Sequence, residues 1–448
     1  MFSKLKLSLR KINYKLFFAL LILGFVPTIY NTARVFFLGQ FPGEWSYSIA
    51  GQLSWVNLLY EITNEAIILP LFYFVGKVKN NKKAFSNCVR TGMLISLAVY
   101  AGLSAVVFVF AEQLLMLMAA DATIIADSVS YIRIESIANI FIILTQFALV
   151  ALVTINKSKY LYLLTGARLI LCLVTDTFLV SGLPFSANYG VNGIGYSNII
   201  VNLLLLVFSV FLLWKEDIQI FAKEEWNFAW AKEFLKVGGF SGFESLVRNI
   251  AYMVMIARMV NVVSEQGTYW VANNFIWGWL LLPVLQLGEL IKQEVAVDRN
   301  NIQRNSLGYF GITTIICLFW FVSIPTWKPF MAQILGFADV DKLFSLVILL
   351  VGFYVLFAFQ NVFDATFYGL GKTNYMLFES VVTNMIYYGI AFALYTTGIW
   401  VPTLTGIALL FGVGNAFDSI VSFCAYVFLL RKQRISIVNI PQSQKPVL

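Results

Sequence analysis

Residues 20–39 read LLILGFVPTIYNTARVFFLG, an apolar run with a proline near its middle and an arginine, Arg34, near its end. About 20 apolar residues span the ~30 Å hydrocarbon layer of a bilayer. A charged side chain at that depth is unfavourable by about 2.5–3.5 kcal/mol on insertion scales. The arrangement recurs about 214 residues later, where Gly24 is matched by Gly238 and Arg34 by Arg248. We therefore interpret the rest of the chain as two halves built around these two helices.

The composition places most of the chain in lipid. Of its 448 residues, 60% are hydrophobic and only 12% are charged, with a mean hydropathy of +0.80, whereas a soluble domain carries roughly 25% charged residues. The apolar runs are long and continuous, which favours helices over the short alternating strands of a β-barrel. The sequence therefore predicts an all-α membrane protein.

Other classes of protein are disfavoured by what the sequence lacks. It contains no histidine, and its four cysteines show no metal-ligand spacing, so they are interpreted as small packing residues. No catalytic constellation is visible, so we expect no enzyme, no metal site and no cofactor. The net charge of +8 is explained by membrane orientation, so we expect no nucleic-acid partner.

Twelve apolar runs predict twelve transmembrane helices. They lie at 16–38, 47–76, 88–111, 131–153, 161–183, 191–214, 237–262, 268–291, 307–327, 343–369, 374–398 and 404–430. One side of the membrane carries 24 lysines and arginines, whereas the other carries only Lys328 and Lys342. Basic loops stay in the cytoplasm, so we predict a multi-pass protein of the cell inner membrane with both termini in the cytoplasm.

Several matches at nearly one offset indicate an internal repeat. Besides the arginines, Pro70 matches Pro283, Lys157 matches Lys372, and Gly193-Ile194 matches Gly406-Ile407. Six helices per copy give a parallel repeat, an architecture in which transporters place the substrate between two halves. The predicted organisation is a six-helix lobe over 1–214, an amphipathic cytoplasmic linker over 215–236, a second six-helix lobe over 237–434, and a disordered tail over 435–448.

Charged residues inside the spans are candidates for a site, because at that depth they face a partner or a cavity. The candidates are Arg34, Glu61, Glu65, Arg133, Glu135, Arg168, Asp176, Glu244, Arg248, Arg258, Glu289, Asp364 and Asp418. Arg133, Glu135, Arg258 and Glu289 lie near the ends of runs, where an interfacial anchor is the favoured interpretation.

Glu61 and Glu65 share one helix face with Asn64 beside them. Because like charges repel, one of the two would hold a proton more tightly, which suits proton coupling; the alternative is a structural contact with an arginine of another helix. Arg34 is a poor candidate for that arginine, since it lies near the outer end of its helix. Glu244 and Arg248 are also four residues apart, as in a helical ion pair. If Arg34 and Arg248 lie at equal depth, the seventh helix begins earlier, within 229–236.

The chain resembles, over essentially its full length, the multidrug and toxic compound extrusion (MATE) family of secondary transporters. The resemblance rests on twelve spans in two repeats and on four phrases: PTIYNTARVFFLG (27–39), ILPLFYFVGK (68–77), YGVNGIGYSN (189–198) and GLGKTNYML (369–377). It implies antiport of a small-molecule solute by alternating access, with multidrug efflux as the family's typical activity.

The departures from the family pattern concern its coupling acids. The first-helix and seventh-helix acids align with Arg34 and Arg248, and the tenth-helix aspartate falls near Asn361, with Asp364 one turn away. Neither the family's proton or sodium coupling nor its preference for cations carries over directly. Two arginines facing one cavity would favour a carboxylate or phosphate. The candidate substrate and coupling residues are Arg34, Glu61, Asn64, Glu65, Glu244, Arg248, Asn361 and Asp364.

The hypothesis is therefore a monomeric secondary transporter that exports an amphipathic organic solute, and that solute is expected to be anionic. Two alternatives stay open. One is a flippase for an anionic lipid or lipid-linked precursor, so a lipid-like substrate and the membrane lipids themselves are expected partners. The other is a membrane scaffold or receptor that moves no solute.

Overall fold

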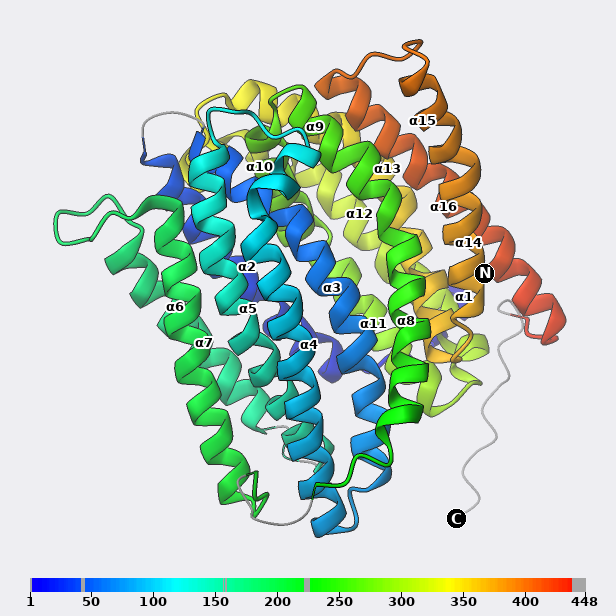
Figure 1. The fold of residues 1–448 in the computed structure, drawn as a ribbon. Helices are drawn as coiled ribbons and strands as arrows, with labels where there is room; N and C mark the ends of the chain where they lie inside the picture. The colour runs from blue at the N-terminus through cyan, green and yellow to red at the C-terminus, as the bar shows by residue number, and fades with distance from the viewer. Residues whose placement is uncertain (1, 42–44, 156, 158, 221–225, 437–448) are drawn as a thin grey trace. The chain divides into compact units, whose positions relative to one another are not determined.

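The computed structural model describes residues 2–41, 45–155, 157, 159–220 and 226–436, which form helices and no strands. Figure 1 shows their course. The α-helices are α1 (Phe2–Lys11), α2 (Tyr14–Gly39), α3 (Trp45–Lys77), α4 (Lys82–Leu117), α5 (Ile125–Thr154), α6 (Lys159–Leu179), α7 (Gly190–Lys215), α8 (Ala231–Tyr252), α9 (Arg258–Val262), α10 (Gln266–Phe275), α11 (Leu282–Val297), α12 (Asn301–Gln333), α13 (Val340–Gly369), α14 (Asn374–Val382), α15 (Gly389–Thr396) and α16 (Leu404–Lys432). Three π-helical segments interrupt them: η1 (Met253–Ala257), η2 (Ile276–Leu280) and η3 (Thr383–Tyr388).

Each of the twelve predicted runs is helical. Among the described residues, nine helices are long and apolar enough to cross a membrane, and Gln266–Leu280 with Leu282–Val297 forms a further span bent by 52°. The remaining two runs are α3 and the α8–α9 stretch, which residues such as Glu61, Glu65 and Arg248 make more polar. The chain is therefore a multi-pass, all-α membrane protein.

The structure consists of two compact units. The larger unit comprises 29–271 and 333–338, and the smaller unit comprises 1–28, 272–332 and 339–448. These bounds differ from the predicted lobes, because α8 packs against α3 inside the larger unit. The division into lobes over 1–214 and 237–434 stays a prediction.

In the larger unit, α5 packs against α4 and α7, and α3 packs against α5 and α8. The core is built from large apolar side chains such as Leu71, Phe147 and Phe234. The α3–α8 contact is unusually close: a methyl group on Gly238 would overlap the backbone carbonyl oxygen of Ala66, and one on Gly242 would lie 2.8 Å from the Cβ of Ala66. Small residues that let backbones touch are the usual device for packing helices in membranes.

The segment before α8 is held against the start of α4. The Asn87 side chain donates to the Asn227 carbonyl (3.0 Å) and accepts from the Asn227 amide (3.2 Å). The Arg90 guanidinium lies 4.4 Å from the ring centre of Trp226. The helix then begins at Ala231, which confirms the predicted early start. Residues 231–236 of the predicted linker therefore belong to α8, while residues 221–225 lie outside the described residues.

In the smaller unit, α13 packs against α11 and α16, and α14 packs against α16. The basic amino-terminal segment forms the helix α1. Its Ser8 hydroxyl accepts from the Gly308 amide (2.8 Å), and the Glu294 carboxylate accepts from the Asn13 amide just beyond it (2.9 Å). Residues 437–448 of the predicted disordered tail lie outside the described residues.

The repeated positions occupy equivalent places along the helices. Lys157 lies between α5 and α6, and Lys372 lies between α13 and α14. Gly193 is in the first turn of α7, as Gly406 is in the first turn of α16. The internal repeat thus extends from sequence to secondary structure.

Candidate functional site

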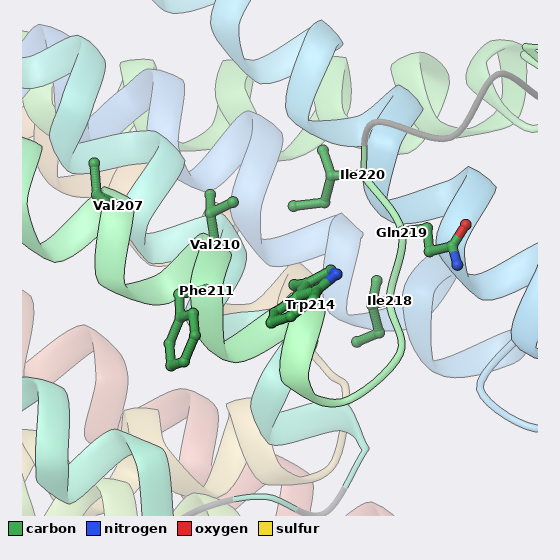
Figure 2. A pocket seen from close by; sticks show the side chains of 7 residues that line it. All are labelled: Val207, Val210, Phe211, Trp214, Ile218, Gln219 and Ile220. Atoms are coloured by element: carbon green, nitrogen blue, oxygen red, sulfur yellow. The ribbon is translucent and has the colours of Figure 1, made fainter.

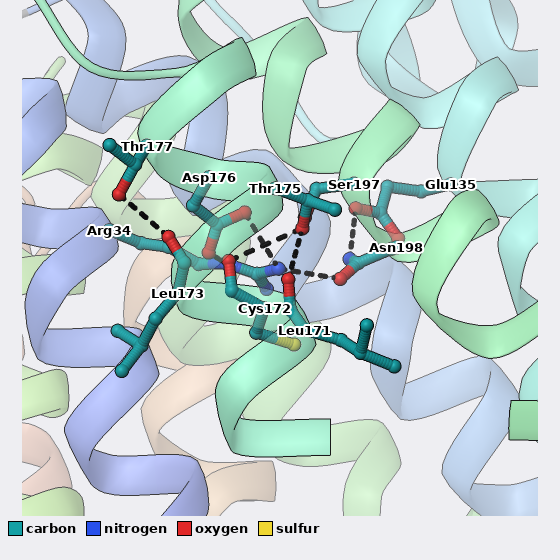
Figure 3. Close-up of polar contacts among 10 residues, drawn as sticks. All are labelled: Arg34, Glu135, Leu171, Cys172, Leu173, Thr175, Asp176, Thr177, Ser197 and Asn198. Carbon is teal, nitrogen blue, oxygen red and sulfur yellow. Dashed lines mark hydrogen bonds and ion pairs between the residues drawn. The ribbon is translucent and has the colours of Figure 1, made fainter. Parts of the chain in front are cut away.

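Arg34 lies at the centre of a buried polar network in the larger unit (Figure 3). Its Nε atom is 2.7 Å from Asp176 Oδ2, and its Nη2 atom is 3.3 Å from Asp176 Oδ1. Nη2 also donates to Asn198 Oδ1 (2.8 Å), and Asn198 Nδ2 donates to Glu135 Oε1 (2.7 Å). The Arg34 guanidinium thereby joins α2 to α6 and α7, and Asn198 extends the network to Glu135 on α5.

This ion pair is buried and its geometry is favourable. The side chains of Arg34 and Asp176 are 9% and 0% exposed, and two-point contact with a carboxylate is the arrangement that suits the planar guanidinium. Arg34 was predicted as a substrate or coupling residue, and in the structure its guanidinium is paired with Asp176. Glu135 is only 2% exposed, so the interpretation of Glu135 as an interfacial anchor is wrong.

Arg248 forms a second, more open ion pair. Its Nη2 atom is 2.6 Å from Glu65 Oε1, and the two side chains are 26% and 25% exposed. The contact joins α8 to α3 just beyond the close approach at Gly238. Glu61 lies one turn before Glu65 on α3 and is exposed, and Asn64 donates to Gln146 (3.3 Å). The structure therefore brings together Glu61, Asn64, Glu65 and Arg248.

The remaining predicted residues are elsewhere. Asn361 and Asp364 belong to the smaller unit, where Asn361 donates to the Val284 carbonyl (2.8 Å) and Asp364 accepts from Ser422 (2.7 Å). Glu244 is in α8, but its side chain lies outside the described residues. The predicted set is thus divided among an Arg34 network, a Glu65–Arg248 pair and positions in the smaller unit.

Of the other arginines in the spans, Arg168 donates to Asn202 Oδ1 (3.0 Å), whereas Arg133 and Arg258 bind backbone carbonyl groups. Arg133 Nε donates to the carbonyl of Phe108, two residues before the non-helical Phe110, and Arg258 Nε donates to the carbonyl of Leu117 at the end of α4. Glu289 pairs with Lys292 on its own helix. The interfacial anchoring of Arg133, Arg258 and Glu289 stays a prediction.

A pocket of about 500 Å³ lies at the end of α7 (Figure 2). It is lined almost entirely by apolar side chains, namely Val207, Val210, Phe211, Trp214, Ile218, Gln219 and Ile220. None of the predicted charged residues contributes to this pocket. It is therefore an apolar groove outside the polar networks rather than part of them.

The structure is thus a multi-pass helical bundle with a buried ion pair, a second, partly exposed ion pair, π-helical turns and a bent span. Residues 77–178, from the end of α3 to the end of α6, match the MatE family model. The segment contains Glu135 and Asp176 of the Arg34 network. No curated protein sequence matches the chain.

Solved structures extend this likeness over nearly the whole chain. An inward-facing multidrug resistance MATE family transporter of the MOP superfamily has a TM-score of 0.75 and 17% identity, and the match covers 91% of this chain and 95% of that one. The outward-facing form of such a transporter gives a TM-score of 0.68 with 16% identity, covering 96% and 98%.

A third structure is a MOP superfamily transporter from Pyrococcus furiosus, described as having a binding pocket of reverse polarity that suggests a different function. It gives a TM-score of 0.68 and 16% identity over 96% of this chain and 98% of that one. The chain thus carries a MatE segment within a MATE transporter fold, which confirms the family resemblance drawn from its sequence.

Proposed function

We propose that this chain is a secondary active transporter that exports an amphipathic organic solute by alternating access. The observation that carries the proposal is the MATE fold over nearly the full length, with charged groups placed inside the spans. Solved relatives of the same fold are described in both inward-facing and outward-facing conformations. The expected setting is the inner membrane with both termini in the cytoplasm, which the charge asymmetry of the loops supports.

The two arginines have different roles in this proposal. Arg34 is buried and held at two points by Asp176, so we assign it a structural role. The Glu65–Arg248 pair is about one-quarter exposed, and its Arg248 can exchange Glu65 for a carboxylate or phosphate of a solute. The expected preference for an anion therefore rests on Arg248 and not on two arginines. The reverse pocket polarity described for the Pyrococcus furiosus relative supports keeping an anion as the substrate class.

A transport assay tests this assignment. We expect proteoliposomes with the wild-type protein to move an anionic amphiphile under an imposed ion gradient, and Arg248→Ala to abolish that movement because the anion loses its counter-charge. Arg304→Ala, which removes a surface pair with Asp298, is the matched control and should transport normally. Movement of a cationic dye instead, unaffected by Arg248→Ala, would reject the anionic preference but keep the transporter.

A further inference from the structure

Three carboxyl groups lie close together in the smaller unit, one on each of three packed helices. They are Asp364 on α13, Glu379 on α14 and Asp418 on α16, and Glu379 lies near enough to both aspartates to interact electrostatically with them. The sequence indicates Asp364 and Asp418 as charges in spans, whereas Glu379 is not among the predicted site residues. Its run, 374–398, was interpreted only as an apolar helix.

The contacts of this acid cluster are hydroxyl and amide groups. Asp418 accepts from Gln360 Nε2 (2.6 Å) and Thr383 Oγ1 (2.7 Å), and Asp364 accepts from Ser422 Oγ (2.7 Å). Gln360 accepts in turn from Ser419 (2.8 Å). In the described part of the chain, no lysine or arginine contacts any of the three carboxyl groups. The acid cluster differs in this from Asp176 and Glu65, which both have arginine partners.

One oxygen of the cluster has no partner at all among the described atoms. Glu379 is 3% exposed, and its Oε2 atom is buried without a hydrogen bond. A buried, unpaired carboxylate oxygen is strongly unfavourable, and neighbouring carboxylates repel each other. A cation bound in the cluster would pair with the free oxygen and would reduce the repulsion between the carboxylates. Asp364 and Glu379 also lie within hydrogen-bonding reach of each other. Two carboxyl groups can form a hydrogen bond only when one of them holds a proton, which favours the proton as that cation.

The fold itself does not require these acids. At the repeat offset of 213–215 residues, the positions equivalent to Asp364, Glu379 and Asp418 in the first half include Val150, Leu164 and Leu204. Those apolar residues lie in α5, α6 and α7, the counterparts of α13, α14 and α16. In the first half, the corresponding helices therefore pack without carboxyl groups at these three positions. The second half has acquired three of them, beside the π-helical segment η3 that begins at Thr383, and such segments are frequent at functional sites.

In the first half, by contrast, the most deeply buried carboxyl group already has a cationic partner. Asp176 is held by the Arg34 guanidinium, which does not lose its proton in proteins. We therefore propose that Asp364, Glu379 and Asp418 form a proton-binding site that couples an ion gradient to transport. This inference rests on the proposed transport function for its role, but the binding of a proton at the site does not.

Infrared spectroscopy of the purified full-length protein in lipid tests proton binding directly. We expect a carbonyl stretching band of a protonated, buried carboxyl group that disappears as pH is raised. The band should be lost in Glu379→Gln and in Glu379→Leu, which copies the apolar residue of the first half, and should change in Asp364→Asn and Asp418→Asn. The matched control is Glu289→Gln, a partly exposed carboxylate paired with Lys292, which should leave the band unchanged.

Transport by the same variants tests coupling. In proteoliposomes, Glu379→Gln should lose transport of the anionic amphiphile driven by a pH gradient, to the level of empty vesicles, but retain exchange without a gradient. A band that is unchanged in all four cluster variants, or replaced at constant pH by added sodium, overturns the proton site. So does full pH-driven transport by both Glu379 variants.

The two proposals fail separately. If the wild-type protein moves neither the anionic nor the cationic probe while the band titrates and requires Glu379, the transport function is rejected and the proton site stands. If the protein transports the probe but the carbonyl band is the same in all variants of the three acids, the proton site is rejected and the transport function stands. Thermal unfolding of each variant shows whether a loss reflects the missing carboxyl group or a failure to fold.

Discussion

Replacement of Asp176 by asparagine is expected to lower the free energy of unfolding by about 3–5 kcal/mol, the usual consequence of leaving one member of a buried ion pair alone. The substitution conserves shape but leaves the Arg34 guanidinium, 9% exposed, without its two-point partner. Glu135 does not replace Asp176, because it reaches the network through Asn198 rather than through Arg34 itself.

The measurement is thermal or denaturant unfolding in detergent, followed by reaction of a thiol probe with Cys172, which is buried one turn before Asp176. The double variant Arg34→Met/Asp176→Asn should recover much of the loss, because no unpaired charge remains. Asp341→Asn, at a mostly exposed pair with Lys328, is the control and should change stability by no more than about 0.5 kcal/mol. An Asp176→Asn protein as stable as wild type would show that Arg34 does not depend on this partner.

Gly238→Ala is expected to destabilise the protein by about 1–3 kcal/mol, as overpacking does in a tight contact. The added methyl group meets the backbone carbonyl of Ala66 and not a flexible side chain, so α8 must move away from α3. The same displacement separates Arg248 from Glu65, which lie on these two helices. We therefore expect loss of anion transport together with loss of stability.

Gly239 provides the matched control in the same helix turn. A methyl group there meets nothing within 4 Å, and alanine is the better helix former by about 1 kcal/mol. Gly239→Ala should therefore unfold at the same temperature as wild type or slightly higher, and should transport normally. Equal behaviour of the Gly238 and Gly239 variants would contradict the close α3–α8 approach.

The helices were predictable because a membrane span needs a long apolar run, and each of the twelve runs is helical. Their irregularities were not. The chain at 110 departs from helical geometry without a proline or glycine there, and η1 and η3 contain neither residue. Such features depend on what the neighbouring helices offer in packing and hydrogen bonds, which a single run does not reveal.

The sequence indicated which charged residues belong to the candidate site, but it did not indicate which of them contact each other. Asp176 was recognised as a charge in a span, but its partner Arg34 is 142 residues away in sequence. Helical depth would have matched them, because Arg34 and Asp176 both lie within the last turns of helices that end at Gly39 and Leu179. The Glu65–Arg248 contact depends on α8 lying against α3, which the two-lobe interpretation did not foresee. For Glu379, the sequence shows only a single acidic residue in an apolar run, which does not indicate a site.

The docked position of α1 has a consequence for how the chain is made. This basic helix is synthesised before its docking surface, because Asn13 and Ser8 contact residues 281 and 300 positions later. At synthesis rates of about 5–20 residues per second, the helix waits roughly 15–60 s for its docking surface to exist. During that interval its positive charges are free to orient the first span. The segment therefore serves first as a topological signal and only later as part of the folded protein.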